Sequence, residues 1–524
     1  MKRRNFLKSA SALAGVPLLL RGVGVSPFGK SSLLNFLNPD NDRVLVLIQL
    51  NGGNDGLNMV LPFDQYDKLG NLRNNILIPE SQGLQLTTEL GLHPVMTGVK
   101  AMYDEARLAL LQSVGYPNQN RSHFRSTDIW TSGSPSDEYW NTGWLGRYLD
   151  EDHLGFPTGY PNSDYPDPLA ITMGSIVSQT CQGLAANYSI ALNDPTSVSL
   201  ISVGAEDEVP DTPYGWELTF LREAIAQTNA YSDVILQAAD NGSNLATYPE
   251  NNNLAEQLRN VALLISGGLQ TKIYVVNLGG FDTHASQVDN GDVTQGTHAS
   301  LLQQLSDAMA AFQSDLNMLG LEERVVGMTF SEFGRQIASN NSAGTDHGTA
   351  APLFVFGSCI NPGIMGDNPQ IPDPQDIEPQ AGVPMQYDFR NIYGSILMDW
   401  FEVDEEVVKG LLFEDFQYMP ILNPCSPPVG SEEAPLPGVP ELTASPNPFH
   451  SSTAFTFFNE QSQYVYLGIY DLRGQELEVL ISKTLPAGEH RIDYLPQQLP
   501  AGTYACRLQL GNGQAVTRLV VKVG

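Results

Sequence analysis

Carboxylates and imidazoles gather in four short segments of the sequence, each adjoining a run of apolar residues. The segments read "NGGND" (51–55), "GGFDTHASQ" (279–287), "SEFGR" (331–335) and "GTDHGTA" (344–350). Aspartate and histidine together bind zinc, manganese and similar ions, and carboxylate-rich sites also take calcium. The sequence therefore predicts a divalent-metal site, with zinc, manganese and calcium as open alternatives. Its candidate ligands are Asp55, Asp282, His284, Glu332, Asp346 and His347.

A fifth segment, "NRSHFRSTDIWTSG" (120–133), offers a nucleophile. Ser122 precedes an expected short helix, whose N-terminus, with the neighbouring Arg121, would help a metal-activated hydroxyl to attack a substrate. Arg121 or Arg335 would then neutralise an anionic group of that substrate. Serine is also a preferred N-cap, so a purely structural Ser122 is the alternative. His123, on the same loop, is a candidate ligand or hydrogen-bonding residue.

The candidate ligands also have structural explanations. Asp55 could close an Asx turn, Asp346 could cap a turn, and Glu332 could pair only with Arg335. Convergence of these segments at one edge of the fold favours the functional interpretation, because interacting ionisable groups cluster at functional sites.

The apolar runs beside these segments predict the strands that position them. "RVLVLIQL" (43–50), "KIYVVNL" (272–278), "RVVGMTF" (324–330) and "PLFVFG" (352–357) are typical of strands buried on both faces. A helical pattern over 295–320 separates the second run from the third. Strand, helix and strand imply a right-handed crossover and a parallel sheet, in which ligands bind beyond the carboxyl ends of the strands.

The expected fold class is α/β, with a second, smaller domain. A mostly parallel sheet with helices on both faces is expected over residues 40–422, and a small all-β sandwich over 441–524. Between them, "NPCSPPVGSEEAPLPGVP" (423–440) has the proline, glycine and acidic residues of a linker. In the tail, short apolar runs alternate with turns, and Gly511-Asn512-Gly513 predicts a hairpin.

Charge and composition exclude several classes of protein. The chain has 58 acidic against 27 basic residues, a formal net charge of -31. Such a surface repels phosphate backbones, so nucleic acid is not an expected partner. No stretch reaches the roughly 18–20 apolar residues of a membrane helix, so no transmembrane span is expected. The four cysteines show no metal-type spacing and allow one disulfide in an oxidising compartment.

The N-terminal sequence predicts export. Arg3 and Arg4 form a twin-arginine pair, followed by a modest apolar run rich in small residues. This pattern is typical of a twin-arginine signal peptide, assigned here to residues 1–30, that engages the twin-arginine translocase through residues 1–20. The folded protein would then cross the inner membrane into the periplasm.

The tail resembles a known family of domains. The motifs that carry the resemblance are "SPNPF" (445–449), "IYDLRGQEL" (469–477), "LPAGEH" (485–490) and "LPAGTYACRLQ" (499–509). They are similar to the C-terminal sorting domain of type IX secretion. The resemblance implies a Bacteroidetes-type bacterium, with the type IX secretion machinery as a partner of 441–524, and a protein secreted or attached to the outer cell surface. An ordinary carbohydrate-binding or spacing sandwich is the alternative.

The core resembles the twin-arginine exported bacterial family catalogued as domain of unknown function 1501, over about residues 40–402. The matching motifs are "LNGGNDGLN" (50–58), "RSHF" (121–124), "FDTHASQ" (281–287), "TFSEFGRQ" (329–336), "GTDHGTAAPLFVFG" (344–357) and "YDFRNIYGSIL" (387–397). The resemblance implies an alkaline-phosphatase-like and sulfatase-like fold without an established substrate.

That superfamily's ligand pattern carries over only in part. Asp55 is similar to its acid after the first strand, Asp282 and His284 to an Asp and His of its second ligand group, and His347 to its late histidine. Asp282 and His284 stand closer in sequence than the superfamily pattern has them, and Glu332-Phe333 replaces an Asp-His pair. One usual ligand is thus missing, so two-metal, single-metal and metal-free sites all stay open.

Two functions follow as hypotheses. The first is an exported metal-dependent hydrolase of phosphate or sulfate esters, acting on small or glycan-borne anionic esters. The second is a non-catalytic surface protein that keeps the hydrolase fold and binds a glycan or a protein partner. The fold alone does not separate them, because function belongs to the site.

Overall fold

The computed structural model describes residues 42–153, 155–197, 212–378, 380–423 and 425, and most strand residues between 442 and 522. The chain divides into two compact units, Met1–Cys425 and Ser426–Gly524. The predicted signal peptide lies outside the described residues, apart from the short strands β1 (Leu19–Leu20) and β2 (Val23–Gly24). Most of the predicted linker lies outside them too.

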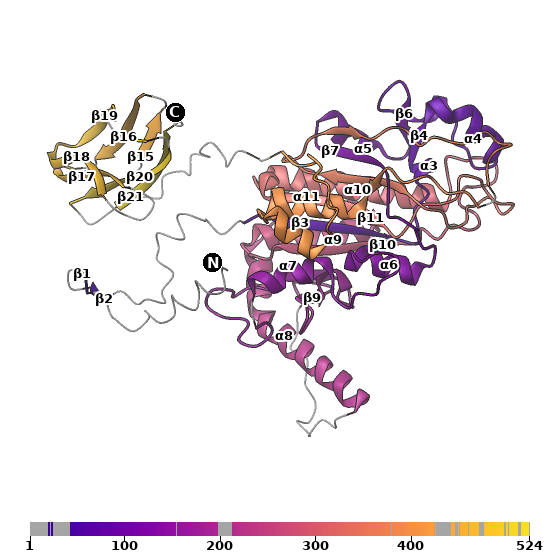
Figure 1. The fold of residues 1–524 in the computed structure, drawn as a ribbon, viewed down its shortest axis with the longest axis horizontal. Helices are drawn as coiled ribbons and strands as arrows, with labels where there is room; N and C mark the ends of the chain where they lie inside the picture. Colours follow the sequence, from indigo (N-terminus) through magenta and orange to yellow (C-terminus); the bar gives the residue numbers. More distant parts are fainter. Residues whose placement is uncertain are drawn as a thin grey trace. The chain divides into compact units, whose positions relative to one another are not determined.

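A large sheet of mostly parallel strands forms the centre of the first unit (Figure 1). Its order is β13-β7-β12-β11-β3-β10-β8-β9, with β14 pairing β7 at one end. The strands are β3 (Val44–Asn51), β7 (Leu108–Gly115), β8 (Ala170–Met173), β9 (Ser189–Leu192), β10 (Ile273–Gly279), β11 (Val325–Ser331), β12 (Ala351–Phe356), β13 (Gly363–Met365) and β14 (Tyr387–Asp388).

All four predicted strands are confirmed, as β3, β10, β11 and β12. Strands β10 and β11 flank β3 and run parallel to it. Strand β12 runs antiparallel to β11. The residues that precede β12 therefore reach the same edge of the sheet as the residues that follow the three parallel strands. This reversal is the reason that a histidine before one strand can meet a histidine after another.

The central strands are buried on both faces because helices cover both. In β3, Val46 and Ile48 belong to one hydrophobic cluster, whereas Leu45 and Leu47 belong to another. The first cluster includes residues of α5 (Thr97–Asp104), α8 (Pro213–Asn241), α9 (Asn253–Ser266) and α10 (Thr297–Met318). The second includes residues of α6 (His123–Ser132), α7 (Trp144–Asp152), α11 (Phe389–Phe401) and α12 (Glu405–Leu411). The predicted α/β layering is confirmed.

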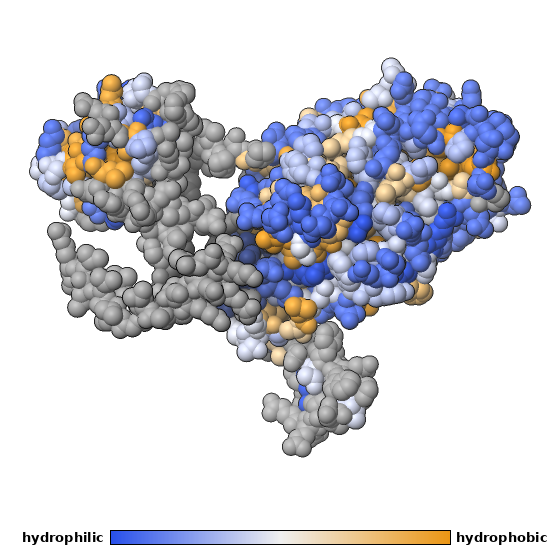
Figure 2. Space-filling model, in the orientation of Figure 1, coloured by the Kyte–Doolittle hydropathy of each residue, from blue (hydrophilic) through white to orange (hydrophobic). Residues whose placement is uncertain are grey.

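Helix α10 confirms the predicted connection between β10 and β11. Its apolar side chains at helical spacing, such as Leu305 and Phe312, are buried against the sheet. Among the described residues, no helix is both long and apolar enough to cross a membrane. On the face shown in Figure 2, hydrophilic residues cover most of the coloured surface of the first unit.

Smaller elements complete the first unit. A three-stranded sheet has the order β4-β6-β5. These elements are α3 (Gly56–Met59), β4 (Val60–Pro62), η2 (Phe63–Gln65), α4 (Tyr66–Leu72), η3 (Glu80–Gln82), β5 (Leu84–Gln85), β6 (Leu90–Leu92), η4 (Gln179–Cys181) and η5 (Glu322–Arg324).

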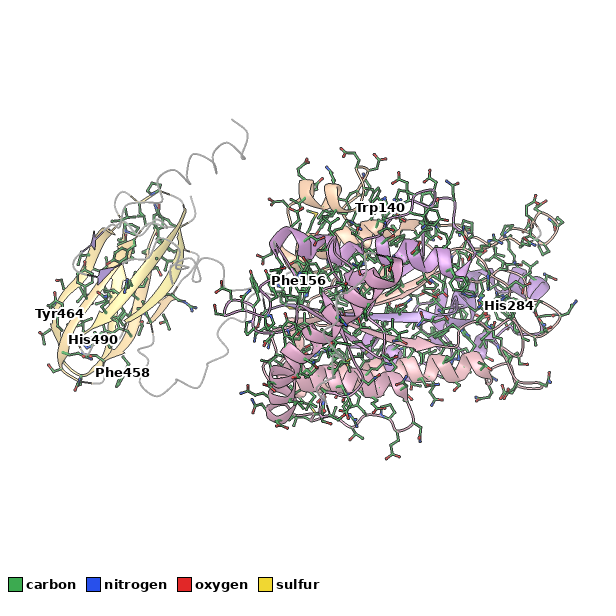
Figure 3. The ribbon with its side chains drawn as sticks, turned by 90° about the horizontal axis from the view of Figure 1, so that it is seen from below. Trp140, Phe156, His284, Phe458, Tyr464 and His490 are labelled. Carbon is green, nitrogen blue, oxygen red and sulfur yellow. A yellow bond between two sulfur atoms is a disulfide. The ribbon has the colours of Figure 1, made fainter. Side chains whose placement is uncertain are left out.

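The second unit is the expected small all-β domain. Two antiparallel sheets have the orders β15-β16-β19 and β18-β17-β20-β21. Val465, Leu467 and Ile469, on one face of β17, are buried in its core, whereas Phe458 and Tyr464 are exposed (Figure 3). The strands are β15 (Leu442–Ser445), β16 (Thr453–Asn459), β17 (Gln463–Tyr470), β18 (Glu476–Leu485), β19 (Gly488–Tyr494), β20 (Gly502–Leu510) and β21 (Ala515–Lys522).

A disulfide joins Cys359, which follows β12, to Cys425 at the end of the first unit. The two residues are 66 positions apart in sequence, whereas Cys181 and Cys506 are free and buried. The four cysteines of the sequence were compatible with one disulfide, and Cys359 and Cys425 form it.

Breaking this disulfide is expected to lower the stability of the first unit. A cross-link over a loop of this length restricts the unfolded chain, so Cys425→Ser should lower the free energy of unfolding by about 2–4 kcal/mol. Chemical denaturation of the full chain under oxidising conditions measures the change. A reductant should destabilise the wild type and leave the variant unchanged. Equal sensitivity of both proteins to the reductant would contradict this expectation.

Candidate metal centre

The loops that leave β3, β10 and β11 meet beyond the carboxyl edge of the sheet, where the loop before β12 and the start of α6 join them. The residues that follow β3 and those that follow β10 approach each other closely. Gly52 has a φ of +123°, and a Cβ atom there would lie 2.3 Å from the backbone nitrogen of Asp282. Only glycine fits this approach, so the two glycines that end the first strand allow the loops to converge.

Three imidazoles surround one carboxylate oxygen at this edge. The Nε2 atoms of His123, His284 and His347 lie 3.4, 3.2 and 3.3 Å from Oδ1 of Asp282. The Nε2 atoms of His284 and His347 are 2.9 Å apart. Candidate ligand atoms of His123, Asp282 and His347 all lie within 4.8 Å of one another. His123, Asp282 and His347 could therefore share an ion at a common point, and Nε2 of His284 lies beside them.

Each imidazole is held by its other nitrogen. Nδ1 of His123 lies 2.9 Å from Oε1 of Glu332, and Nδ1 of His284 lies 2.8 Å from Oδ1 of Asp346. Nδ1 of His347 lies 2.7 Å from the carbonyl oxygen of Arg121. Carboxylates and carbonyls that bind one ring nitrogen in this way orient the other toward a metal.

One ring nitrogen has no hydrogen-bond partner among the described residues, although Oδ1 of Asp282 lies 3.4 Å from it. Nε2 of His123 is buried and makes no hydrogen bond with the described residues. A buried polar atom without a partner is costly, because it loses its water without gaining a new contact. A cation at the common point would satisfy this atom, so the donor set fits a metal ion.

The electrostatics of the centre favour the ligand forms of its residues. Burial raises the pKa of Asp282, but Arg335 outweighs this effect through a hydrogen bond and its charge, so the pKa lies below the ordinary value. Burial lowers the pKa of His347, with Arg335 and His123 acting in the same direction. A charged carboxylate and a neutral imidazole are the forms that bind metals.

Arg335 is a positioning residue, in contrast to its predicted role on a substrate. Its side chain is buried, and its guanidinium donates to the carbonyl oxygens of Gly53, Thr345, Gly52 and Phe281. It also donates to Oδ1 of Asp282 at 2.8 Å. These contacts fasten the loops together, and the side chain is buried, so the guanidinium is not accessible to a substrate anion.

Two residues predicted as ligands, Glu332 and Asp346, contact the Nδ1 atoms of two of the histidines. Glu332 is 4% exposed; its Oε1 accepts from the backbone nitrogen of Gly52 at 2.8 Å and contacts His123. Asp346 contacts His284 and also accepts from the side chain of Asn340. The structure therefore gives both carboxylates an orienting position, where the sequence interpretation had placed them among the ligands.

Asp55 lies in a separate, buried network. Its carboxylate is 3.0 Å from Nη1 of Arg73 and accepts from Nε2 of Gln287 at 2.6 Å. Oε1 of Gln287 in turn accepts from the hydroxyls of Thr283 and Thr345, which flank His284 and His347 in sequence. The structure thus differs from the predicted ligand set at Asp55, because a neighbouring guanidinium already neutralises this acid. The network braces the loops that carry the histidines.

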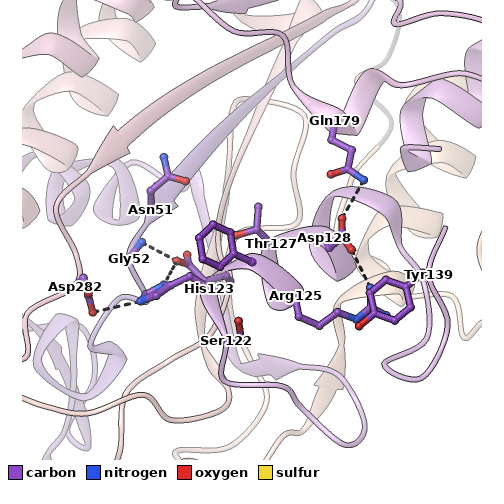
Figure 4. A pocket seen from close by; sticks show the side chains of 12 residues that line it. Asn51, Gly52, Ser122, His123, Arg125, Thr127, Asp128, Tyr139, Gln179 and Asp282 are labelled. Atoms are coloured by element: carbon purple, nitrogen blue, oxygen red, sulfur yellow. Dashed lines mark hydrogen bonds and ion pairs between the residues drawn. The ribbon is translucent and has the colours of Figure 1, made fainter. Parts of the chain in front are cut away.

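An open cavity of about 800 Å³ adjoins the centre (Figure 4). Ser122, His123 and Asp282 all line it. Ser122 is exposed at the N-cap of α6, and its side chain makes no capping hydrogen bond. The side chain of Arg121 instead donates to the carbonyl oxygen of Gln380 at 2.7 Å. The hydroxyl of Ser122 is therefore accessible from the cavity, whereas Arg121 is absent from its lining.

The sequence placed Asp282, His284 and His347 correctly at one edge, and left the role of His123 open. His123 belongs to a helix that follows β7, away from the four predicted strand ends. Phe333 is buried, and its ring lies 5.0 Å from that of His123 and 4.6 Å from that of His347. At that position a phenyl ring packs the histidines and provides no ligand.

Comparisons with known proteins agree with the resemblance of the core. A family model described as "Protein of unknown function (DUF1501)" matches residues 42–412. No curated protein matches the chain.

Solved structures similar to the chain have low sequence identity. The sulfatase PsFucS1 from Pseudoalteromonas sp. is 11% identical, covers 90% of this chain and 86% of its own, and has a TM-score of 0.27. A Bacteroides thetaiotaomicron protein described with the metabolism of multiple glycosaminoglycans is 10% identical, with coverages of 84% and 89% and a TM-score of 0.32. A Vibrio parahaemolyticus protein of the alkaline phosphatase superfamily is 10% identical, with coverages of 80% and 76% and a TM-score of 0.28.

Proposed function

The chain belongs to the DUF1501 family of proteins of unknown function, and from that premise we propose that it is a metal-dependent hydrolase of phosphate or sulfate esters. The observation that carries the proposal is the convergence of three imidazole Nε2 atoms on Oδ1 of Asp282. His123, His284, His347 and Asp282 would hold one divalent ion. This ion would supply Lewis-acid chemistry to an ester and to water.

The donor set narrows the choice of metal. Three imidazole nitrogens and one carboxylate suit zinc or manganese, whereas calcium prefers a shell of oxygens. The charges around the centre also call for a cation. Asp282, Glu332 and Asp346 supply three carboxylates against the one guanidinium of Arg335. A divalent ion would balance the remaining negative charge. Phe333, in place of a further ligand, favours one ion over two.

Ser122 is proposed as the nucleophile. Its hydroxyl opens onto the cavity beside His123 and Asp282, and the backbone nitrogens at the start of α6 would attract an anionic ester. Oγ of Ser122 would bond to the phosphorus or sulfur atom as the ester P–O or S–O bond breaks, and the alcohol would leave with a proton. The proton of Ser122 would pass to solvent or to a neighbouring base. Water would then hydrolyse the seryl ester, release phosphate or sulfate and restore the serine. The orienting carboxylates Glu332 and Asp346 would keep the histidines in the metal-binding tautomer.

An activity screen with Ser122→Ala tests the hydrolase proposal. The full chain, loaded with zinc or manganese, should hydrolyse p-nitrophenyl phosphate or p-nitrophenyl sulfate. Ser122→Ala is expected to lower kcat by about a hundred-fold or more while its metal content stays at the wild-type level. Arg121→Ala is the matched control, since its side chain points to Gln380. Absence of all esterase activity in fully metal-loaded wild type would contradict the proposal.

A non-catalytic surface protein that binds a glycan or protein partner is the second candidate. The observation that favours it is the cavity lining. Among the described residues that line the cavity, Arg125 is the one lysine or arginine, and its donors contact Asp128 and the carbonyls of Pro135, Ser136 and Glu138. No free cationic side chain is thus offered to an anionic group. This candidate predicts ligand binding without turnover.

We further propose that the protein is exported through the periplasm to the cell surface. The twin-arginine motif and the type IX sorting motifs support this route, as does the β-sheet unit that carries the latter motifs. The disulfide between Cys359 and Cys425 supports an oxidising compartment, because such bonds are rare where thiols are kept reduced. Cell fractionation with and without residues 441–524 tests the role of the tail.

A further inference from the structure

A second cavity of about 700 Å³ adjoins the cavity of the metal centre. The two share Asn51, Thr127 and Gln179, which Figure 4 labels in the lining of the first cavity. The two cavities therefore form a continuous opening at this edge of the sheet. The second cavity is lined mainly by side-chain amides and hydroxyls, and no lysine or arginine is among its described lining residues. Its only charged lining residues are Asp194 and Glu256.

Two strands bring amides into this cavity from an otherwise apolar sheet. Gln49 of β3 and Asn277 of β10 are direct partners in the strand register. Their neighbours Ile48 and Leu278 are buried apolar residues. The side chain of Gln49 is half-buried and lines the cavity. An amide that opens onto a cavity from a core strand can donate to and accept from a polar ligand.

Helix α9 presents a polar stripe to the same cavity. Asn253, Gln257 and Asn260 lie on one face of the helix, at helical spacing, and all line the cavity. Gln257 is fixed by two hydrogen bonds to the backbone of Asn277, each of 2.9 Å. Asn260 is 6% exposed and its amide has no hydrogen bond with the described residues. An amide that faces a cavity in this way offers both a donor and an acceptor to a polar ligand.

Two exposed aromatic rings line the cavity of the metal centre. Phe124 is 91% exposed and Tyr139 is 75% exposed, and both line the cavity of the metal centre. The guanidinium of Arg125 lies 3.9 Å from the ring centroid of Tyr139 and holds this ring in place. Such rings offer flat apolar faces with little rotational freedom to lose on binding.

We propose that the continuous opening binds an uncharged oligosaccharide chain. Each amide offers both donors and acceptors, as sugar hydroxyls require, and the flat rings match the apolar faces of sugar rings. Asp194 and Glu256, with no lysine or arginine among the described lining residues, disfavour a polyanionic chain in the second cavity. The neutral chain would occupy the second cavity, and its end would reach the metal centre. Only the identity of the reacting group at that end rests on the proposed hydrolase function.

Binding of neutral sugars to the metal-free full chain tests the inference apart from the hydrolase proposal. Maltohexaose and cellohexaose are the probes in isothermal titration, with an oligogalacturonate of equal length as the polyanionic comparison. At least one neutral probe should bind, and the oligogalacturonate should bind more weakly. Asn260→Leu and Gln49→Leu should each weaken binding by about ten-fold, because each removes a hydrogen-bonding amide.

Asn317→Leu is the matched control, since Asn317 is exposed on α10 and lines neither cavity. Melting curves show whether each variant is folded, and Asn260→Asp supplies a variant of the same shape if the leucine variant is not. Failure of both neutral probes, stronger binding of the oligogalacturonate, or unchanged binding in both cavity variants would overturn the inference. Preference for a neutral peptide such as hexa-alanine would overturn it as well. Sugar binding without esterase activity would remove the hydrolase proposal alone.

Discussion

Alanine in place of His284 is expected to abolish stoichiometric zinc binding. The substitution removes a nitrogen that lies 3.2 Å from Oδ1 of Asp282 and 2.9 Å from Nε2 of His347. Loss of a residue that merely orients a ligand lowers metal affinity by about 10–100-fold, so loss of the ligand itself should lower it by more than about 100-fold. Metal content by mass spectrometry and competition with a zinc indicator measure the change in the full chain.

Glu332→Gln separates a ligand from an orienting residue. Glu332 contacts Nδ1 of His123, and an amide of the same shape keeps one oxygen for that contact. We expect a loss of zinc affinity of about 10–100-fold, smaller than the loss in His284→Ala. If His284→Ala kept wild-type zinc affinity, or Glu332→Gln lost more than it, the assignment of ligands would be wrong. Asp282→Ala combined with His284→Ala should bind no zinc.

The second large effect is expected from Arg73→Met. Arg73 and Asp55 are completely buried, with side-chain exposures of 0% and 1%. Arg73 also donates to the carbonyl oxygens of Gln336 and Ile337. Removing the guanidinium leaves a buried carboxylate without its counter-charge, which should lower the free energy of unfolding by about 3–5 kcal/mol. Denaturant titration of the full chain measures this change.

The control for Arg73→Met is Lys100→Met, which breaks the partly exposed pair of Lys100 with Asp104. This change should cost at most about 1 kcal/mol, because solvent screens the pair. The double variant Asp55→Asn with Arg73→Met should be more stable than Arg73→Met alone, since it removes the unpaired charge. Equal stability of the single and double variants would show that the lost carbonyl contacts, and not the charge, dominate.

The pair between Asp55 and Arg73 also sets a dependence of stability on pH. Burial raises the pKa of Asp55, but Arg73, His298 and Gln287 together outweigh this and hold it below the ordinary value of 3.8. Since the folded pKa lies below the unfolded one, the stabilisation is fully present above about pH 4 and is lost as the pH falls through the folded pKa. Arg73→Met should weaken this acid dependence.

Much of the fold was accessible from the sequence because its core strands carry a strong signal. Strands buried on both faces must be nearly continuous apolar runs, so β3, β10, β11 and β12 were readable from composition. The antiparallel direction of β12 could not be predicted, because an apolar run does not indicate which way its strand runs in the sheet. The shorter strands β13 and β14 carry too few residues for a periodic pattern.

The candidate site could be predicted only in part. The sequence indicates which residues lie near strand ends, but it does not indicate which group each side chain contacts. Asp282, His284 and His347 follow or precede core strands, and they meet. Asp55 also follows a core strand, but it is paired with Arg73, which follows α4 and which no spacing rule connects to it. Glu332 was predicted as a ligand because it follows a core strand. Its carboxylate instead contacts Nδ1 of His123, which belongs to α6.

The disulfide near the end of the first unit has a mechanical consequence. A pull on the C-terminal domain, as attachment to a surface under flow would produce, reaches the first unit at Cys425. From there the load crosses to Cys359, which directly follows β12 in the middle of the large sheet. The segment between the two cysteines, with α11 and α12, is bypassed. Tension therefore enters the large sheet through the residues after β12, and α11 and α12 cannot be peeled away one after another while the disulfide is intact.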